Sequence, residues 1–282
     1  MIIDAHHHLW RLDRGDYDWL TADLVPLHRD FTAADLAPLM AAAGVEGGMV
    51  VQAAPTAAET DYLLALAART PTILGVVGWT DLTAPDAGEA IARLARDPAL
   101  KGLRPMLQDL PDDDHILRPP VDAALGALAA SGLRFEALVR PRHLPRLLAV
   151  RERHPDLAMI VNHAAKPDIA GGGWEPWASD LRRLAADGLT VCKLSGLVTE
   201  AGAEWDVERL RRYVDLVLDA FGPDRVMWGS DWPVLLLAGT YGGWLEAAER
   251  LLGGLTGPER AAILGGTARR VYGLGAPAES EA

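Results

Sequence analysis

The chain of 282 residues lacks the features that would place a protein outside the cell or in a membrane. It has one cysteine, Cys192, which cannot form an intramolecular disulfide, and the apolar run around it predicts a buried, reduced thiol. No apolar run is long enough to span a bilayer without charge, and the N-terminus has no basic region followed by a long apolar segment. We therefore expect an unprocessed cytoplasmic protein with no membrane partner.

Positive charge is scarce as well. Lys and Arg number 27 against 39 Asp and Glu, the formal net charge is −12, and no basic stripe reverses the sign locally. Such a surface repels phosphate backbones and anionic membranes, so we expect no nucleic-acid partner. The chain can nevertheless bury a large core, because 50% of its residues are hydrophobic.

Short apolar runs alternate with Ala- and Leu-rich segments of helical period. Eight runs have the length and composition of buried strands, and a predicted helix follows each of them. The predicted strands are 1–5, 45–52, 72–79, 100–107, 133–139, 157–162, 189–194 and 225–229. The predicted helices are 32–43, 56–70, 86–97, 119–131, 143–154, 174–187, 207–221, 241–252 and 258–265. We therefore predict an α/β fold, a single-domain (β/α)8 TIM barrel over residues 1–273, with a frayed tail at 274–282.

The alternative fold for such a pattern is a doubly wound open sheet. That fold binds phosphates through a Gly-rich turn that opens a helix directly after a strand. The three glycines at 171–173 stand in a predicted loop instead, and no other predicted strand has such a turn after it. The barrel is therefore the better interpretation.

Polar side chains stand at the carboxyl ends of several predicted strands, on the face that carries the active site of barrel enzymes. The first strand runs into His6, His7 and His8. Because strand side chains alternate, His6 and His8 point to one side, about 6 to 7 Å apart, while His7 points to the other. His163 ends the sixth strand, and Asp231 ends the eighth, which neighbours the first once the barrel closes.

Imidazoles and a carboxylate in this arrangement suit two kinds of chemistry. They can bind a divalent ion that lowers the pKa of a water, or they can position and deprotonate that water directly. Polar strand ends can also merely cap a core, and for a lone histidine that interpretation is favoured. A His-x-His, an Asn-His and a Gly-Ser-Asp at matching barrel positions favour a functional site.

Seven segments, in order along the chain, resemble the amidohydrolase superfamily, in the branch that contains sugar-lactone hydrolases such as fuconolactonase-like enzymes. One such segment is weak evidence, whereas the ordered set is specific for the branch, though not for one substrate. The segments are IIDAHHHLWR at 2–11, VQAAPTAAET at 51–60, KGLRPMLQD at 101–109, ILRPPV at 116–121, VNHAAKP at 161–167, CKLSGLVTEA at 192–201 and RVMWGSDWPV at 225–234.

The resemblance implies a hydrolase of carbohydrate metabolism that opens a small lactone, either a sugar 1,4-lactone or a sugar 1,5-lactone. It implies that Asp231 activates the water that attacks the carbonyl. It also implies that His6, His8 and His163 are the catalytic partners of this carboxylate.

The resemblance also bears on the metal. Binuclear members of the superfamily place a lysine or similar bridging group on strand 4 and a histidine on strand 5, where this chain has Arg104 and Glu136. A binuclear centre is therefore not expected. Some members of this branch work without a tightly held metal, so two candidates remain open, a metal-free site and a mononuclear site. For the mononuclear site zinc is the first candidate, and the candidate ligands are His6, His8, Asp231 and Glu136.

Four further residues are candidate substrate contacts. The planar guanidinium of Arg104 can bind a carboxylate, a hydroxyl or a developing oxyanion, although it can equally pair with a barrel carboxylate. Lys166 follows His163 by three residues. Sugar rings also bind to flat aromatic faces, and among the nine tryptophans we select Trp10 and Trp232.

Two other functions remain as alternatives. One is a metal-dependent decarboxylase of the same superfamily, which would need a firmly bound divalent ion. The other is a catalytically silent barrel that only binds a sugar acid or lactone. The outer helical faces of a barrel also leave room for a homo-oligomer, which no sequence feature selects.

Overall fold

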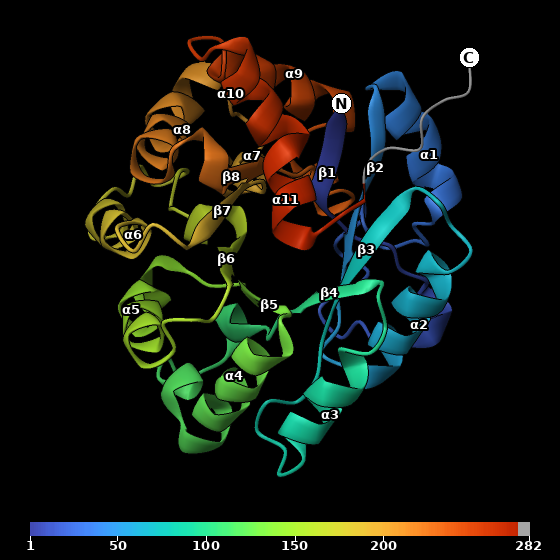
Figure 1. The fold of residues 1–282 in the computed structure, drawn as a ribbon. Coiled ribbons are helices and arrows are strands. Elements are labelled where there is room, and N and C mark those ends of the chain that lie inside the picture. The colour runs from blue at the N-terminus through green and yellow to red at the C-terminus, as the bar shows by residue number, and fades with distance from the viewer. Residues whose placement is uncertain (276–282) are drawn as a thin grey trace.

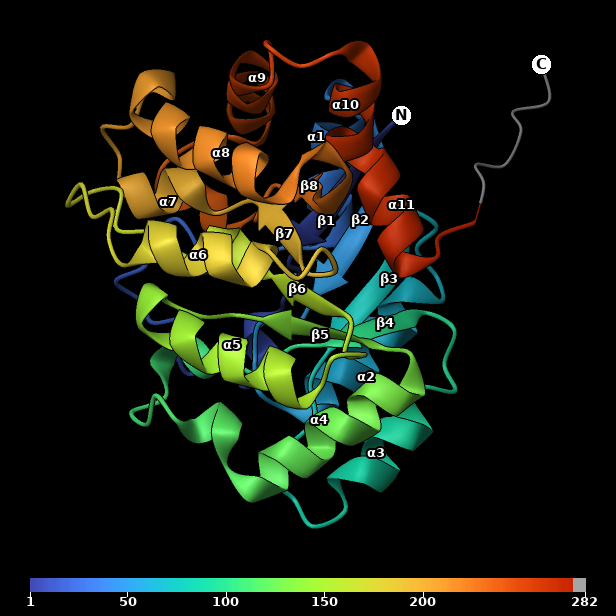
Figure 2. The same cartoon turned by 60° about the vertical axis from the view of Figure 1, so that its left-hand side comes forward.

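The computed structural model describes residues 1–275, in which eight parallel strands form one sheet in sequence order, with helices around its outside (Figures 1 and 2). The strands are β1 (Ile2–His7), β2 (Val45–Val51), β3 (Ile73–Gly78), β4 (Leu100–Leu103), β5 (Arg134–Ala137), β6 (Met159–Val161), β7 (Val191–Leu194) and β8 (Val226–Trp228). The prediction of a single-domain (β/α)8 barrel is confirmed. The predicted boundary at residue 273 stays a prediction, and residues 276–282 of the predicted tail lie outside the described residues.

Helices follow the strands as predicted, with additions. They are α1 (Ala33–Ala42), α2 (Ala57–Ala67), α3 (Ala87–Leu94), α4 (Pro119–Ser131), α5 (Leu144–Arg153), α6 (Trp177–Ala185), α7 (Leu197–Ala201), α8 (Val207–Phe221), α9 (Tyr241–Leu251), α10 (Gly257–Ala261) and α11 (Thr267–Tyr272). The short α7 was not predicted. The last predicted helix, 258–265, is divided into α10 and a π-helical turn at Ala262–Gly266, and the following α11 was not predicted either. At this turn the chain packs so closely on β1 that a Cβ on Gly265 would lie 2.9 Å from the Met1 carbonyl oxygen.

The predicted fourth strand is too long. It ends at Leu103, because Pro105 has no N–H to donate to a neighbouring strand, and the chain then turns through a 3-10 helix at Leu107–Asp109. Strand β1 is longer than predicted and continues to His7. His6 and His7 therefore belong to the strand and His8 follows it directly, while the register of β1 against β2 shifts between Asp4 and His7.

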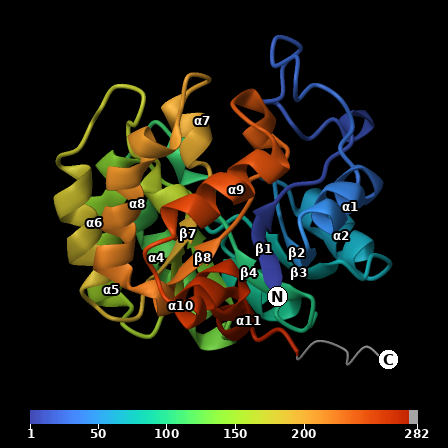
Figure 3. The same ribbon diagram turned by 90° about the horizontal axis from the view of Figure 1, so that it is seen from above.

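The core has two parts. Inside the barrel, apolar side chains of the strands pack on Ala268 and Tyr272 of α11, which lies across the end where the strands begin (Figure 1). A larger cluster fills the space between the strands and the outer helices. The long segment between β1 and α1 projects on the side away from both termini (Figure 3), over the end where the strands finish. No helix within residues 1–275 has the length and apolar character needed to cross a bilayer.

The barrel closes between β1 and the chain that follows β8. The N–H of Asp231 donates to the His6 carbonyl oxygen at 2.7 Å, and the N–H of His8 donates to the Trp232 carbonyl oxygen at 2.7 Å. Gly229 permits this approach, since a Cβ there would lie 2.8 Å from the Cβ of His6. The closing hydrogen bonds therefore pass through the residues that the sequence predicts to be functional.

A buried carboxylate reinforces this closure. Asp4 has no exposed surface and accepts hydrogen bonds from the Ser230 N–H at 2.8 Å, the Ser230 hydroxyl at 2.6 Å and the His6 N–H at 3.1 Å. The Tyr241 hydroxyl of α9 donates to the same carboxylate at 3.1 Å. One side chain on the first strand thus holds the end of the last strand and the following helix.

We expect the Asp4→Ala variant to lose about 3 kcal/mol in the free energy of unfolding, because four buried donors lose their common acceptor. Urea denaturation followed by circular dichroism measures this change. Asp156→Ala, at an exposed carboxylate, is the matched control and should stay within about 0.5 kcal/mol of the parent. Equal stability of the two variants would contradict the role assigned to Asp4.

Candidate active site

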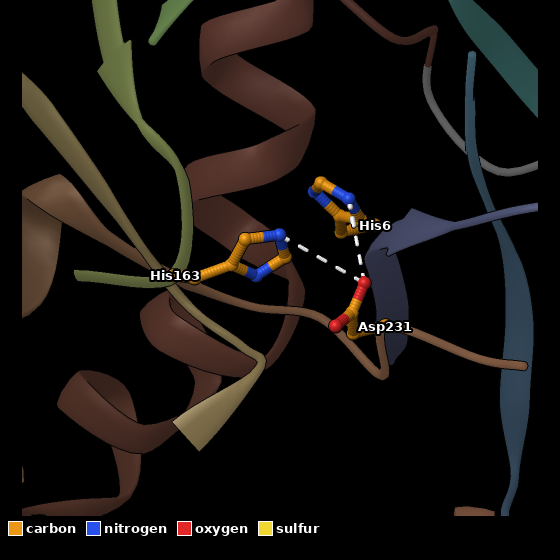
Figure 4. Close-up of side chains that lie close together, drawn as sticks. All are labelled: His6, His163 and Asp231. Carbon is orange, nitrogen blue, oxygen red and sulfur yellow. Dashed lines mark ion pairs between the residues drawn. The ribbon is translucent and has the colours of Figure 1, made fainter. Parts of the chain in front are cut away.

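One carboxylate oxygen stands among three imidazoles at the carboxyl end of the barrel. The Oδ1 atom of Asp231 lies 3.7 Å from His6 Nε2, 3.4 Å from His8 Nε2 and 3.8 Å from His163 Nε2 (Figure 4 shows the first and the last). The four side chains come from β1, the end of β6 and the end of β8, and all are buried. The structure therefore brings together the four residues predicted to be catalytic, while His7 packs away from them against Gly48.

The backbone is strained at the same place. Within residues 1–275, positive φ angles at residues other than glycine occur only at Asp231, with φ 58°, and over four consecutive positions, 163–166, with φ between 48° and 61°. Residues with a Cβ rarely adopt this left-handed conformation, and such strain is typical of functional sites. At Asp231 it is held by the hydrogen bond to His6 and by the Leu235 N–H, which donates to the Asp231 carbonyl oxygen at 2.9 Å.

A directed chain of hydrogen bonds sets the imidazole tautomers. His8 Nδ1 lies 2.7 Å from the Val51 carbonyl oxygen, which only accepts, so Nδ1 carries the proton and Nε2 has a free lone pair. The Lys193 ammonium, which only donates, lies 3.3 Å from His6 Nδ1. The proton of a neutral His6 therefore sits on Nε2, 3.3 Å from the lone pair of His8 Nε2. His163 is oriented separately, by a 2.9 Å contact of its Nδ1 with the Ser195 hydroxyl.

Burial and charge keep the imidazoles neutral and the carboxylate ionised. Burial lowers the pKa of His163 to about 3, and burial together with the nearby Lys193 lowers the pKa of His6 well below its usual value. For Asp231, burial alone would raise the pKa, but the neighbouring His163 and His8 rings and the Lys166 charge outweigh it and lower the pKa to about 2. At neutral pH the group is therefore one anion among three neutral rings.

Lys193 is the functional residue that sequence reasoning missed. This β7 side chain has no exposed surface, and its Nζ lies 2.6 Å from Glu136 Oε2 and 3.3 Å from His6 Nδ1. Glu136 also accepts hydrogen bonds from Asn162 Nδ2 at 2.9 Å and from the Tyr272 hydroxyl of α11. The sequence suggested Glu136 as a candidate metal ligand. In the structure Glu136 instead pairs with the buried Lys193 cation, which also contacts His6, and it is not part of the group that could hold a metal. A lysine inside the apolar run 191–194 was the available signal.

Arg104 is a second buried cation at the site. Its guanidinium lies 3.4 Å from His6 Nε2 and is held by the carbonyl oxygen and the side-chain oxygen of Gln52. Burial lowers its pKa to about 10, so it stays charged at neutral pH. The hydrogen bonds to Gln52 fix a positive charge in one position beside the imidazoles.

A cavity of about 250 Å³ opens onto this group. Its polar lining includes His8, His163, Asp231, Arg104 and Lys166. Two further residues of the lining, Thr199 and Gln108, each have a buried side-chain oxygen with no hydrogen-bond partner within residues 1–275. Both stand in segments after strands, where sequence pattern does not reveal which side chains face inward.

The aromatic wall of the cavity is Trp19, which was not among the predicted substrate contacts. Trp10 and Trp232 are almost fully buried and pack edge-to-face on Phe31, at ring distances of 5.4 and 5.1 Å. Neither lines the cavity, so their predicted contact with substrate is corrected. Trp10 supports the site indirectly, since its ring lies 5.5 Å from that of Trp19.

The described residues include one group able to hold a metal ion, formed by His6, His163 and Asp231, whose ligand atoms lie within 4.8 Å of one another. The separations of 3.7 and 3.8 Å from the carboxylate oxygen are close to the edge of about 3.4 Å expected for a tetrahedron of donors around zinc. The donor set of two imidazoles and one carboxylate also suits zinc. The residues present therefore fit a single divalent ion.

Comparison with known proteins places this geometry in a family. The sequence profile of the family described as Amidohydrolase matches residues 3–274. An L-fucono-1,5-lactonase of Burkholderia ambifaria is 48% identical over 279 residues, which cover 98% of this chain and 96% of that protein. An L-fucono-1,5-lactonase of Burkholderia multivorans is 40% identical over 293 residues, which cover 99% of this chain and 98% of that protein. A crystal structure of an amidohydrolase from Burkholderia multivorans with bound zinc has a TM-score of 0.92 and 39% identity, covering 98% of this chain and all of that one.

We expect the buried imidazoles to stay neutral in the folded protein at pH 5. NMR of protein with isotope-labelled histidine reports the protonation of each ring, and urea-unfolded protein, in which histidine titrates near 6.5, is the reference. The pKa of His163 falls from 6.5 to about 3 on folding, so between pH 3 and pH 6.5 the unfolded state binds more protons than the folded state. The contribution of His163 to stability is therefore present above pH 6.5 and is lost as the pH falls toward 3. A His163 signal that titrates near 6.5 in the folded state would contradict this electrostatic description.

Proposed function

The chain belongs to the amidohydrolase family, and on that premise we propose that it hydrolyses a sugar lactone, with L-fucono-1,5-lactone as the first substrate to test. The observation that carries this proposal is an ionised Asp231 facing the same small cavity as a fixed Arg104 cation. A water-activating base and a cation for the developing oxyanion are the two elements that lactone hydrolysis requires. Relatives 40 to 48% identical over almost the whole chain support the substrate class.

The reaction begins with a water bound between Asp231 and the lactone carbonyl. Asp231 accepts a proton from this water as the oxygen attacks the carbonyl carbon. A carboxylate with a pKa of about 2 is a weak base, but His8 Nε2 lies 3.4 Å from Asp231 Oδ1, and its lone pair becomes a second acceptor for the proton once it gives up its hydrogen bond from His6 Nε2. The low pKa keeps Asp231 anionic, and His8, whose own pKa burial lowers, shares the proton with the carboxylate.

The negative charge that develops on the carbonyl oxygen needs a donor that is already in position. Arg104 lies in the cavity wall with its guanidinium fixed by Gln52, so it can stabilise the oxyanion without reorganising. Lys166 lines the same cavity and is paired with Glu200 at 3.4 Å, which leaves its other N–H groups for a substrate oxygen. When the tetrahedral intermediate collapses, the ring C–O bond breaks and the proton held at Asp231 and His8 passes to the departing ring oxygen.

We propose that His6, His163 and Asp231 hold zinc when the ion is available. A bound divalent ion would polarise the lactone carbonyl or lower the pKa of water. Two features of the chain weaken its binding. His6 Nε2 must give up its proton to Nδ1, which then faces the Lys193 ammonium, and the Arg104 guanidinium stands 3.4 Å from the same Nε2.

The two alternatives from the sequence are not favoured. A decarboxylase of this superfamily would depend on a firmly held ion, which the cations beside His6 disfavour. A silent sugar-acid-binding barrel would not need an ionised carboxylate with a proton acceptor beside it. A cytoplasmic location, consistent with the free buried Cys192, and a homo-oligomeric state stay predictions.

We expect Asp231→Asn to lower kcat for L-fucono-1,5-lactone by about 10²- to 10⁴-fold, because the amide cannot accept the proton of water. Acid release followed with a pH indicator measures the turnover, and circular dichroism checks the fold. Asp168→Asn, the same change at an exposed carboxylate outside the cavity, is the matched control and should keep the parent rate. Parental kcat in a folded Asp231→Asn variant would remove Asp231 from the mechanism.

We also expect a chelator to remove zinc from the protein without abolishing lactone hydrolysis, since Asp231, His8 and Arg104 provide base and oxyanion stabilisation by themselves. Elemental analysis before and after treatment reports the metal content, and the same samples are assayed for acid release. Loss of turnover on zinc removal, restored by adding zinc back, would show that the ion is required for the reaction.

A further inference from the structure

A second cavity adjoins the one that contains Asp231. It has a volume of about 400 Å³ and is lined by the segments after β1, β3 and β4, at the same end of the barrel. The two cavities share three wall residues, Trp19, Met106 and Asp109. The two cavities are therefore direct neighbours at this end of the barrel. The mechanism of lactone opening makes no use of the second cavity.

The size of the two cavities separates their roles. The site cavity of about 250 Å³ suits one small ring, whereas both cavities together lie within the roughly 300–1,000 Å³ of pockets that enclose larger ligands. The second cavity is the larger of the two. Its lining contains four aspartates and no Lys or Arg from residues 1–275, whereas Arg104 and Lys166 line the site cavity. A simple monosaccharide lactone would leave the second cavity unfilled.

The lining of the second cavity combines aromatic faces with carboxylates. Trp19 and Trp79 provide the faces, and the carboxylates are those of Asp16, Asp18, Asp81 and Asp109. No Lys or Arg from residues 1–275 lines it, and burial lowers the pKa of His115, the remaining basic group. Aromatic faces bind the apolar faces of sugar rings, and carboxylates accept hydrogen bonds from sugar hydroxyls.

Two of the carboxylates keep an oxygen available. Asp16 pairs with Arg14 at 2.5 Å and with the Thr56 hydroxyl at 3.1 Å, both through Oδ2. Asp81 accepts from the N–H and hydroxyl of Thr83, both through Oδ1. In each case the contacts within residues 1–275 orient the carboxylate and leave its second oxygen for a ligand hydroxyl.

We propose that the second cavity is a subsite for an uncharged sugar unit carried on the lactone, so that the enzyme also opens glycosylated aldonolactones. This inference rests on the proposed lactonase function. Water adds across the ring ester and the C–O bond of the lactone breaks as before, while the glycosidic bond stays intact. Asp16 and Asp109 pair with Arg14 and Arg140, so an anionic uronic acid unit is repelled mainly by Asp18 and Asp81, which have no Lys or Arg partner within residues 1–275. An alkyl chain would desolvate the carboxylates without offering a hydroxyl in return.

The test compares kcat/KM for D-glucono-1,5-lactone with that for the same ring carrying a neutral hexose, as cellobiono-, maltobiono- and lactobiono-1,5-lactone. L-Fucono-1,5-lactone reports the basal reaction. We expect at least one glycosylated lactone to be hydrolysed with a kcat/KM at least equal to that of the bare ring. A lactone carrying a uronic acid unit should fall at least tenfold below its neutral counterpart.

Thr80→Trp fills the second cavity and leaves the first unchanged, since Thr80 lines only the second and takes no part in the mechanism. We expect it to lower kcat/KM for the preferred glycosylated lactone at least tenfold and to leave the value for the bare ring unchanged. Thr80→Val is the matched control and should resemble the parent.

The outcomes distinguish the subsite from the proposed function. If the bare lactones are hydrolysed and no glycosylated lactone is, or if Thr80→Trp lowers both rates equally, the subsite is overturned and the lactonase stands. If no lactone is hydrolysed, the proposed function fails, and calorimetric binding of cellobionate and gluconate tests the subsite alone. Binding of cellobionate at least tenfold tighter than gluconate, lost in Thr80→Trp, supports the subsite, and equal binding overturns it.

Discussion

The rest of the molecule depends on the hydrogen bonds that join β1 to the chain after β8. A parallel barrel needs its first strand to meet its last, and here the contact runs between His6, His8 and the residues at 231 and 232. Closing the barrel and assembling the site are therefore one event. The buried Asp4 carboxylate adds to this, since it holds Ser230 and His6 at once and so sets the distance between base and imidazole. The same contacts stabilise the barrel and position the catalytic groups, so a substitution there changes both the stability and the activity.

Buried charge gives the site its second constraint. Four ionised groups are removed from water here, and each needs a partner, because an isolated buried charge is costly. Lys193 is matched by Glu136, while Arg104 and Asp231 both approach Nε2 of His6. The neutral rings of His6 and His8 link these charges in one directed chain of hydrogen bonds, in which Lys193 donates to His6, His6 donates to His8 and His8 donates to the Val51 carbonyl oxygen. The consequence is a site whose proton positions are set before any substrate arrives.

The sequence predicts the fold because eight apolar runs separated by helical segments admit few other arrangements. It predicts His6, His8, His163 and Asp231 because strand ends of a barrel converge on one face. It could not predict that Glu136 faces a lysine, because a strand pattern says which side a residue takes and not which neighbour it meets. The choice of Trp10 over Trp19 failed for a related reason. Both follow β1 closely, and only the path of the loop decides which ring is enclosed and which faces the cavity.

The joining of β1 to the end of β8 also has a consequence for synthesis. Asp4 and Ser230 are 226 positions apart, so the ribosome makes the first strand long before its last partner exists. At cellular elongation rates of about 5–20 residues per second, β1 waits roughly ten seconds or longer with one edge unpaired. An exposed strand edge invites pairing with other chains. The strand that carries the histidines is thus the part of the nascent protein that most needs protection until the chain is nearly complete.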